Sequence, residues 1–124
     1  MDTPLYERLG GQQGIAALVD EVIEAHLRNP VINARFLPLL EDPDRLELVK
    51  RHTREFLGSG AGGPEQYTGT DMRTVHGGMN VDEHELVAAI DDILGVLDKR
   101  GAEQRDKDEV LAMLYGLKGN VLHV

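Results

Sequence analysis

Hydrophobic residues recur every three or four positions along the chain, and no segment alternates between apolar and polar residues over the length of a strand. The most regular stripe lies between Gln12 and Leu27, and Asn29-Pro30 follows it as a stop signal. Its apolar members are Ile15, Leu18, Val19, Val22, Ile23 and Leu27. The pattern predicts an all-α fold with a long amphipathic helix near the N-terminus.

Proline and cap residues predict where two more helices begin. Thr3-Pro4 predicts the N-cap and first turn of a short helix, which Gly10-Gly11 ends. Asp42-Pro43 predicts a helix that reaches about Leu57. Its expected inner face is formed by Leu46, Val49, Thr53, Phe56 and Leu57. The run from Gly58 to Pro64 is too rich in glycine to continue that helix.

The second half of the chain carries two further helical stripes after a long connection. Asp82 and Glu85 have the spacing of a capping box, and Arg100-Gly101 ends the helix that follows. The inward positions are Leu86, Ile90, Ile93, Leu94 and Leu97 in this helix, and Val110, Met113, Leu114, Leu117 and Val121 in the last one. Residues 58–80 are poorly helical apart from a short stretch at 70–76. So long a connection in a small domain indicates a function or a packing partner.

Composition limits the class of protein. The 124 residues fit a single domain, 1–124, and the absence of cysteine excludes disulfides, thiolate metal sites and cysteine nucleophiles. A net charge of −9 argues against a nucleic-acid partner, because phosphate contacts need clustered lysine and arginine. No signal peptide is visible, and no apolar run approaches the roughly 20 residues that span a bilayer. We therefore expect a cytoplasmic protein with no membrane partner, and a monomer.

Five histidines are the plausible soft ligands, although a single histidine is more often a surface or core residue. His52 borders the apolar face of its helix, and His76 follows Met72 by four positions. Two histidines on separate elements, each beside apolar side chains, can flank a flat apolar ligand that carries a metal, and imidazole is the usual axial ligand of haem iron. His84 and His123 are predicted to be exposed, and the pattern does not decide the place of His26.

Other site chemistries have weaker support. The chain has no His-Glu-x-x-His pair for zinc, no nucleophile elbow and no phosphate loop. A histidine-based metallohydrolase therefore lacks a ligand cluster. A helical interaction module without a cofactor stays open as an alternative of another class.

Motifs at both ends of the chain resemble one family. Leu5 to Gly11, then Phe56-Leu57, Gly62-Gly63-Pro64, Tyr67-Thr68-Gly69, Met72 and His76, look like the signature of the group I truncated haemoglobins. The resemblance covers essentially the whole chain. It implies a shortened globin, in which two helices cross over two others around one b-type haem.

The resemblance also implies roles for residues of this chain. His76 falls on the proximal iron ligand, and Phe36, Met72 and Val81 fall on residues that pack against the haem. The predicted haem-binding residues are Phe36, Val49, Lys50, His52, Thr53, Phe56, Tyr67, Met72, His76 and Val81, with His76 and His52 as the candidate metal ligands. In relatives that attach haem covalently, a histidine stands close to the position of Gly119. Because His123 lies beyond it, we expect noncovalent haem.

The ligand side departs from the family pattern. Members usually have a tyrosine where Ile23 stands and often a glutamine where Thr53 stands, and neither Ile23 nor Val22 can donate a hydrogen bond. This weakens the case for tight oxygen storage. In some cyanobacterial members a histidine at the position of His52 binds the iron, and we hypothesise the same here. The alternative is a His52 that faces solvent or a haem propionate, with which Lys50 and Arg51 are also predicted to pair.

The resemblance implies chemistry of diatomic ligands such as oxygen, nitric oxide and carbon monoxide. Nitric oxide dioxygenation would make the chain an enzyme and would need a reductase partner. A bis-histidine haem would favour electron transfer, another redox role or gas sensing. The residues leave these functions open beside a globin fold that binds no haem.

Overall fold

The computed structural model describes residues 3–123, and within that range the chain is helical with no β-strand. The elements are α1 (Leu5–Arg8), α2 (Gly11–Arg28), α3 (Asn33–Phe36), the 3₁₀ helix η1 (Leu37–Glu41), α4 (Pro43–Gly60), α5 (Met72–His76), α6 (Glu83–Lys99), α7 (Gln104–Tyr115) and α8 (Lys118–Val121). The all-α prediction is confirmed. No helix in residues 3–123 has both the length and the apolar character to cross a membrane.

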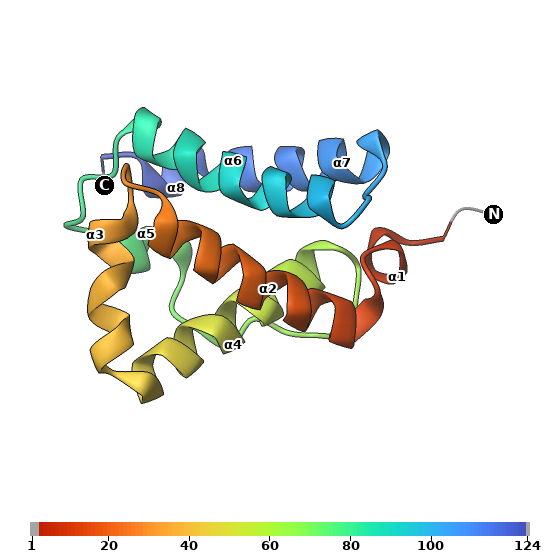
Figure 1. The fold of residues 1–124 in the computed structure, drawn as a ribbon, viewed down its shortest axis with the longest axis horizontal. Helices are drawn as coiled ribbons and strands as arrows, with labels where there is room; N and C mark the ends of the chain where they lie inside the picture. The colour runs from red at the N-terminus through yellow and green to blue at the C-terminus, as the bar shows by residue number, and fades with distance from the viewer. Residues whose placement is uncertain (1–2, 124) are drawn as a thin grey trace.

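The four long helices form two layers. In one layer α2 packs against α4, and in the other α6 packs against α7, while α2 also contacts α6 across the layers (Figure 1). The predicted arrangement of two helices over two is confirmed. The short helices α3 and α5 lie at one end of the molecule, on the left in Figure 1, and α5 contacts α8 near the C-terminus.

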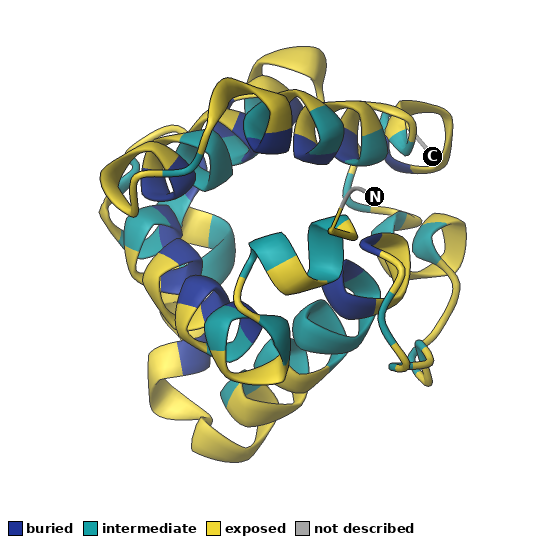
Figure 2. Cartoon of the chain, turned by 90° about the vertical axis from the view of Figure 1, so that its right-hand side faces the viewer, coloured by how far each residue is buried: buried dark blue, intermediate teal, exposed yellow. Residues whose placement is uncertain are grey.

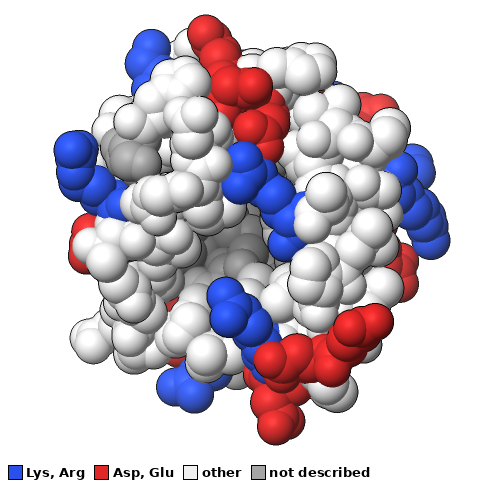
Figure 3. All heavy atoms as spheres, turned by 90° about the vertical axis from the view of Figure 1, so that its left-hand side faces the viewer, with Lys and Arg blue, Asp and Glu red and all other residues white. Residues whose placement is uncertain are grey.

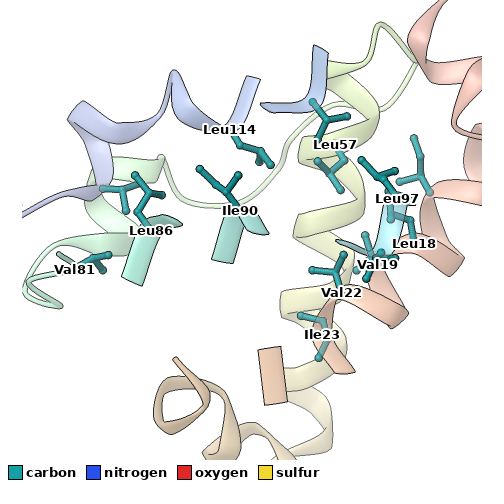
Figure 4. Close-up of a cluster of buried hydrophobic side chains, with 14 residues drawn as sticks. Leu18, Val19, Val22, Ile23, Leu57, Val81, Leu86, Ile90, Leu97 and Leu114 are labelled. Atoms are coloured by element: carbon teal, nitrogen blue, oxygen red, sulfur yellow. The ribbon is translucent and has the colours of Figure 1, made fainter. Parts of the chain in front are cut away.

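The core lies between the layers, where the predicted stripes meet. Leu18, Val19 and Leu97 are almost completely buried, with exposed fractions of 1%, 0% and 2%. They belong to a continuous apolar cluster with members on α2, α4, α6 and α7 (Figure 4). Burying one such side chain contributes about 1.5–3 kcal/mol. Figure 2 shows the buried residues on the inward faces of the helices, as the periodicity predicts.

The structure corrects one predicted helix start and explains another. The N-cap of α1 is Pro4, which makes no side-chain cap bond, so Thr3 as the cap is wrong. Instead, the Tyr6 amide donates to the Ala61 carbonyl at 3.0 Å, so a distant loop fixes this single turn. Helix α5 begins at Met72 because the Asp71 carboxylate accepts a bond from the Thr74 amide at 3.1 Å.

Two helix ends were also predicted wrongly. Helix α4 continues to Gly60, and its last turn packs so closely that a Cβ added at Gly58 or Gly60 would lie 2.6 Å from Glu65 or Met113. Close packing there outweighs a glycine's helix cost of about 1 kcal/mol. The last predicted helix divides into α7 and α8 around Gly116. The capping box at the start of α6 is confirmed.

The turn between α1 and α2 requires glycine. Gly10 has a φ of +97°, and a Cβ there would lie 2.9 Å from the Gly14 Cα. Arg8, at the end of α1, pairs with Asp106 of α7, and with Glu109 at 2.5 Å. At the other end, Val81 and Leu122 form an isolated bridge, so the chain end is fixed beside the start of α6.

Candidate functional site

An apolar cavity of about 170 Å³ opens at the end of the molecule that carries α3 and α5. It is lined by Ile32, Arg35, Phe36, His76, Met79, Val81, Glu85, Leu86, Ala89, Ile90, Ile93, Leu114, Leu117 and Val121. Figure 3 shows that this face is hollowed and that basic side chains lie beside the hollow. The cavity therefore brings together three of the predicted site residues, Phe36, His76 and Val81.

His76 is the last residue of α5, and one of its ring nitrogens is already bonded. Its Nδ1 lies 2.8 Å from the Met72 carbonyl oxygen, one helical turn earlier. A carbonyl accepts only, so Nδ1 carries a proton, and in the neutral ring Nε2 has the lone pair. This is the tautomer in which an imidazole can bind a metal through Nε2.

A buried polar pair supports the wall around Phe36. His26 is 6% exposed, its Nδ1 donates to Asp92 Oδ2 at 2.8 Å, and its ring centroid lies 4.8 Å from that of Phe36. Asn29 Nδ2 also donates to both oxygens of Asp92 at 3.1 Å. Burial lowers the pKa of His26, and this effect outweighs the raising effect of Asp92. In the sequence, His26 follows Val22 by four positions and so falls on the buried stripe of α2. This spacing is the signal that indicates a buried His26.

Arg35 closes the cavity at its polar edge. Its Nε donates to Glu85 Oε2 at 2.5 Å, and its Nη2 donates to the Met79 carbonyl at 3.0 Å. The pair raises the pKa of Arg35 and lowers that of Glu85, mainly through the hydrogen bond between them. Arg35 therefore joins α3 to α6 and to the turn after α5, a link that no local pattern in the sequence reveals.

The predicted α4 residues lie outside the lining of this cavity. Val49 and Phe56 pack against the core, and Lys50 Nζ pairs with Asp20 Oδ1 at 3.2 Å. The Thr53 hydroxyl donates to the Val49 carbonyl at 2.7 Å, so its hydrogen is already used. Ile23 is buried and apolar.

His52 lies on the side of α4 that faces the connection before α5. Its Nδ1 lies 3.1 Å from Glu55 Oε1, which also accepts bonds from the amide and hydroxyl of Thr68 at 3.0 and 2.8 Å. We call these three residues the Glu55 cluster. Hydrogen bonds from Thr68, first from its amide, lower the pKa of Glu55 to about 2. The ionised carboxylate accepts only, so Nδ1 of His52 carries a proton, and in the neutral ring Nε2 has the lone pair.

Tyr67 packs edge-on against the His52 ring. Its ring centroid lies 5.8 Å from that of His52 and 6.2 Å from that of Phe56, both edge-on. Its hydroxyl donates to the Thr70 carbonyl. A Cβ on Gly69 would lie 3.0 Å from His52 Cγ, so only glycine leaves room for this packing. His52 is therefore held among aromatic and loop residues rather than on the cavity wall.

The other predicted residues lie near the two ends of the connection and at the chain end. Met72 is half-buried at the start of α5. His84 and His123 are exposed, as predicted. The His123 Nδ1 lies 2.8 Å from Asn80 Oδ1.

The model of the bacterial-like globin family matches residues 4–123. The chain belongs to this family. The resemblance to truncated haemoglobins noted in the sequence is thus confirmed.

Curated relatives of this globin are group 1 truncated hemoglobins. It is 29% identical over 119 residues to the protein of a Nostoc species, covering 96% of this chain and 97% of the relative. It is 28% identical over 118 residues to the protein of Tetrahymena pyriformis, and the match covers 95% of this chain and 93% of that relative.

Solved structures share the fold of this globin. The ferric truncated hemoglobin of Tetrahymena pyriformis superposes with a TM-score of 0.88 at 23% identity, covering 98% of this chain and all of the other. The 2/2 hemoglobin of Synechococcus, a structure with covalently attached heme, superposes with a TM-score of 0.85 at 22% identity. The match covers 97% of this chain and 98% of the other. The two-over-two globin fold is therefore shared along the whole length of each.

The donor set and the lining fit a haem. An imidazole with a free Nε2 borders a cavity whose other walls are mostly aliphatic or aromatic, and imidazole in an apolar pocket is the usual environment of haem iron. Arg35 at the rim offers a cationic group of the kind that a propionate can meet. The cavity is smaller than the roughly 300–1,000 Å³ of ordinary ligand pockets. The lining therefore accounts for the surroundings of His76 and Phe36, whereas the residues predicted from α4 lie outside it.

Proposed function

We propose that this chain is a haem b protein that binds diatomic gases, with His76 as the axial ligand of the iron. The observation that carries the proposal is the place of His76 on an apolar cavity with Nδ1 bonded to Met72. When bound, the haem supplies an iron at which oxygen, nitric oxide or carbon monoxide can coordinate.

The residues of this chain would divide the work of holding the cofactor. Phe36 and Val81 line the cavity and would pack against the ring, and Met72 precedes His76 on the same short helix. Val49, Thr53 and Phe56 would approach from α4, and Tyr67 from the connection. Lys50 would reach a propionate only by leaving Asp20.

The α4 side of the site offers few hydrogen-bond donors to a bound gas. Ile23 has no donor, and the Thr53 hydroxyl hydrogen is bonded to Val49. A ligand such as oxygen, which gains most from a donated hydrogen bond, would be bound less strongly than in a site with a tyrosine donor. We therefore favour gas sensing or a redox role such as electron transfer over tight oxygen storage. Nitric oxide dioxygenation, the candidate enzyme activity, would need a reductase partner.

His52 is our candidate for a second axial ligand when no gas is bound. The observation that favours it is that no described hydrogen bond uses Nε2 of His52, the ring nitrogen through which it would bind the iron. His52 does not line the cavity, so it would have to turn away from Tyr67 to reach the iron. Gas affinity would then fall by the fraction of molecules in which His52 is bound.

We expect the haem to be noncovalent, in contrast to the attached heme of the Synechococcus structure. His123 bonds Asn80 and lies beyond the position near Gly119 that the resemblance indicates. Extraction of haem into acidified organic solvent after reconstitution tests this: free haem in the organic layer is the expected result. A cytoplasmic location and a monomeric state stay predictions of the sequence, as does a single domain.

A haem titration followed by absorption tests the proposed function. The full chain should take up one haem per molecule, and His84→Ala, which removes an exposed histidine, should behave identically. His76→Ala should lose the histidine-bound spectrum, and added imidazole should restore it. No uptake by the unchanged chain would contradict the proposal and favour the haem-free interaction module. Uptake with an unaltered spectrum in His76→Ala would show that another residue binds the iron.

A further inference from the structure

One carboxylate joins His52 to the connection that precedes α5. Glu55 Oε1 accepts the bonds from His52 Nδ1 and from both donors of Thr68, while Arg51 Nε lies 3.3 Å from Oε2. The Glu55 side chain is 16% exposed. Thr68 stands 13 residues further along the chain, so the cluster fixes the connection to α4. Bonds to a charged acceptor are stronger than neutral ones.

The same contacts determine where the His52 ring lies. Glu55 bonds one edge of the ring, Tyr67 packs against it, and Gly69 leaves the room that the packing needs. The side chain of His52 is 27% exposed, and it is absent from the lining of the cavity that contains His76. The ring is therefore held on the side of the connection, with its free Nε2 unused by any described bond.

We propose that Glu55 is a positioning residue that holds His52 away from the iron and so controls how often His52 binds it. Thr68 acts through Glu55, because its two donors orient the carboxylate toward His52. The proposal rests on the proposed function, since His52 competes with gases only when haem is bound. Through Glu55, the ordered connection then influences the affinity for gases, although the connection itself donates no hydrogen bond to the gas.

The first test uses nuclear magnetic resonance of the full chain before haem is added. In the unchanged chain we expect His52 to carry its proton on Nδ1 and the Thr68 amide to exchange slowly with solvent. Glu55→Ala should lose both features, and Glu55→Gln, whose amide oxygen still accepts, should keep most of them. Glu47→Ala is the matched control, because Glu47 lies on the same helix and pairs with Arg54. An unchanged His52 and Thr68 in Glu55→Ala would overturn the proposal.

The second test measures the six-coordinate share of the reduced, haem-loaded chain by absorption. Glu55→Ala should raise the ratio of six- to five-coordinate iron roughly tenfold, the effect of losing one hydrogen bond to a charged group. Thr68→Val should raise it less, Glu47→Ala should leave it unchanged, and Glu55→Ala with His52→Ala should abolish the six-coordinate form.

The outcomes separate this proposal from the one on which it rests. A chain that takes up no haem overturns both. Haem uptake with an unchanged or lower ratio in Glu55→Ala overturns only the role of Glu55. A carbon monoxide affinity that falls in step with the rising six-coordinate ratio supports it, because His52 then competes with the gas for the iron.

Discussion

The four long helices and the connection at 61–81 are held by different forces. Between the helices, Val19 and Leu97 are almost completely buried among apolar neighbours. In the connection, α5 has no buried residue, and polar groups such as Glu55 and Asp71 make the fixing contacts. Stability therefore resides mainly in the helical layers, whereas the candidate iron ligands depend on a few polar contacts. A single substitution can alter those contacts without unfolding the chain.

The largest effect should come from the core. Leu18→Ala removes a side chain that is 1% exposed, so we expect a loss of about 3 kcal/mol, within the range of 2–5 for buried leucines. Urea unfolding followed by circular dichroism measures it. The matched control is Leu48→Ala on the outside of α4, where 48% of the residue is exposed and the change should stay within about 0.5 kcal/mol. Equal losses would contradict the division between core and surface.

His26 stands between the two regions, since it is buried in the layers yet supports Phe36 at the cavity. His26→Leu leaves Asp92 without its imidazole partner and should cost about 1–3 kcal/mol. His26→Gln, which retains a donor, should cost less. Unfolding in urea measures both, and a stable His26→Leu chain would show that the pair contributes nothing.

The same histidine predicts a pH dependence. Burial lowers its pKa, so below about 6.5 the unfolded chain takes up a proton that the folded chain does not. The stability that His26 contributes is therefore fully present above that pH and is lost as the pH falls through the folded pKa. His26→Gln should lack this part of the slope when unfolding is measured between neutral and mildly acidic pH. An identical slope in both chains would contradict the assignment.

The smallest global effect is expected at the cap of α5. Asp71→Ala removes the bond to the Thr74 amide, worth about 1 kcal/mol, from a helix of five residues. Hydrogen exchange should therefore accelerate at α5 while the urea midpoint stays unchanged. Asp42→Ala removes the equivalent cap of α4 and should lower the urea midpoint instead. If Asp71→Ala also lowered the urea midpoint, α5 would unfold only together with the two helical layers.

Local patterns predicted the elements well. The stripe from Ile15 to Ile23 is buried as its period requires, and the capping box of Asp82 and Glu85 forms because its partners are three residues apart. Such signals depend on neighbours in the sequence, so they can be recognised without knowing the fold. The glycines after Leu57 misled because Gly58 and Gly60 lie inside α4, where Glu65 and Met113 leave no room for a Cβ.

Contacts between distant residues could not be predicted in the same way. The bond from His52 to Glu55 is local, but the bonds from Thr68 depend on how the connection returns to α4. The bond of His26 to Asp92 joins α2 to α6 across 66 positions. The family motif identified His76 as a candidate, whereas its bond to Met72 and its place on the cavity wall come from the structure.

The decisive measurement is the absorption spectrum of the haem-loaded chain in its ferric and reduced forms, beside His52→Ala. We expect haem uptake in both, with sharp split visible bands in the reduced chain that diminish or vanish in His52→Ala. A broad five-coordinate spectrum that the substitution leaves unchanged would contradict a role for His52 while keeping His76 as the ligand. A chain that binds no haem at all would contradict the central claim.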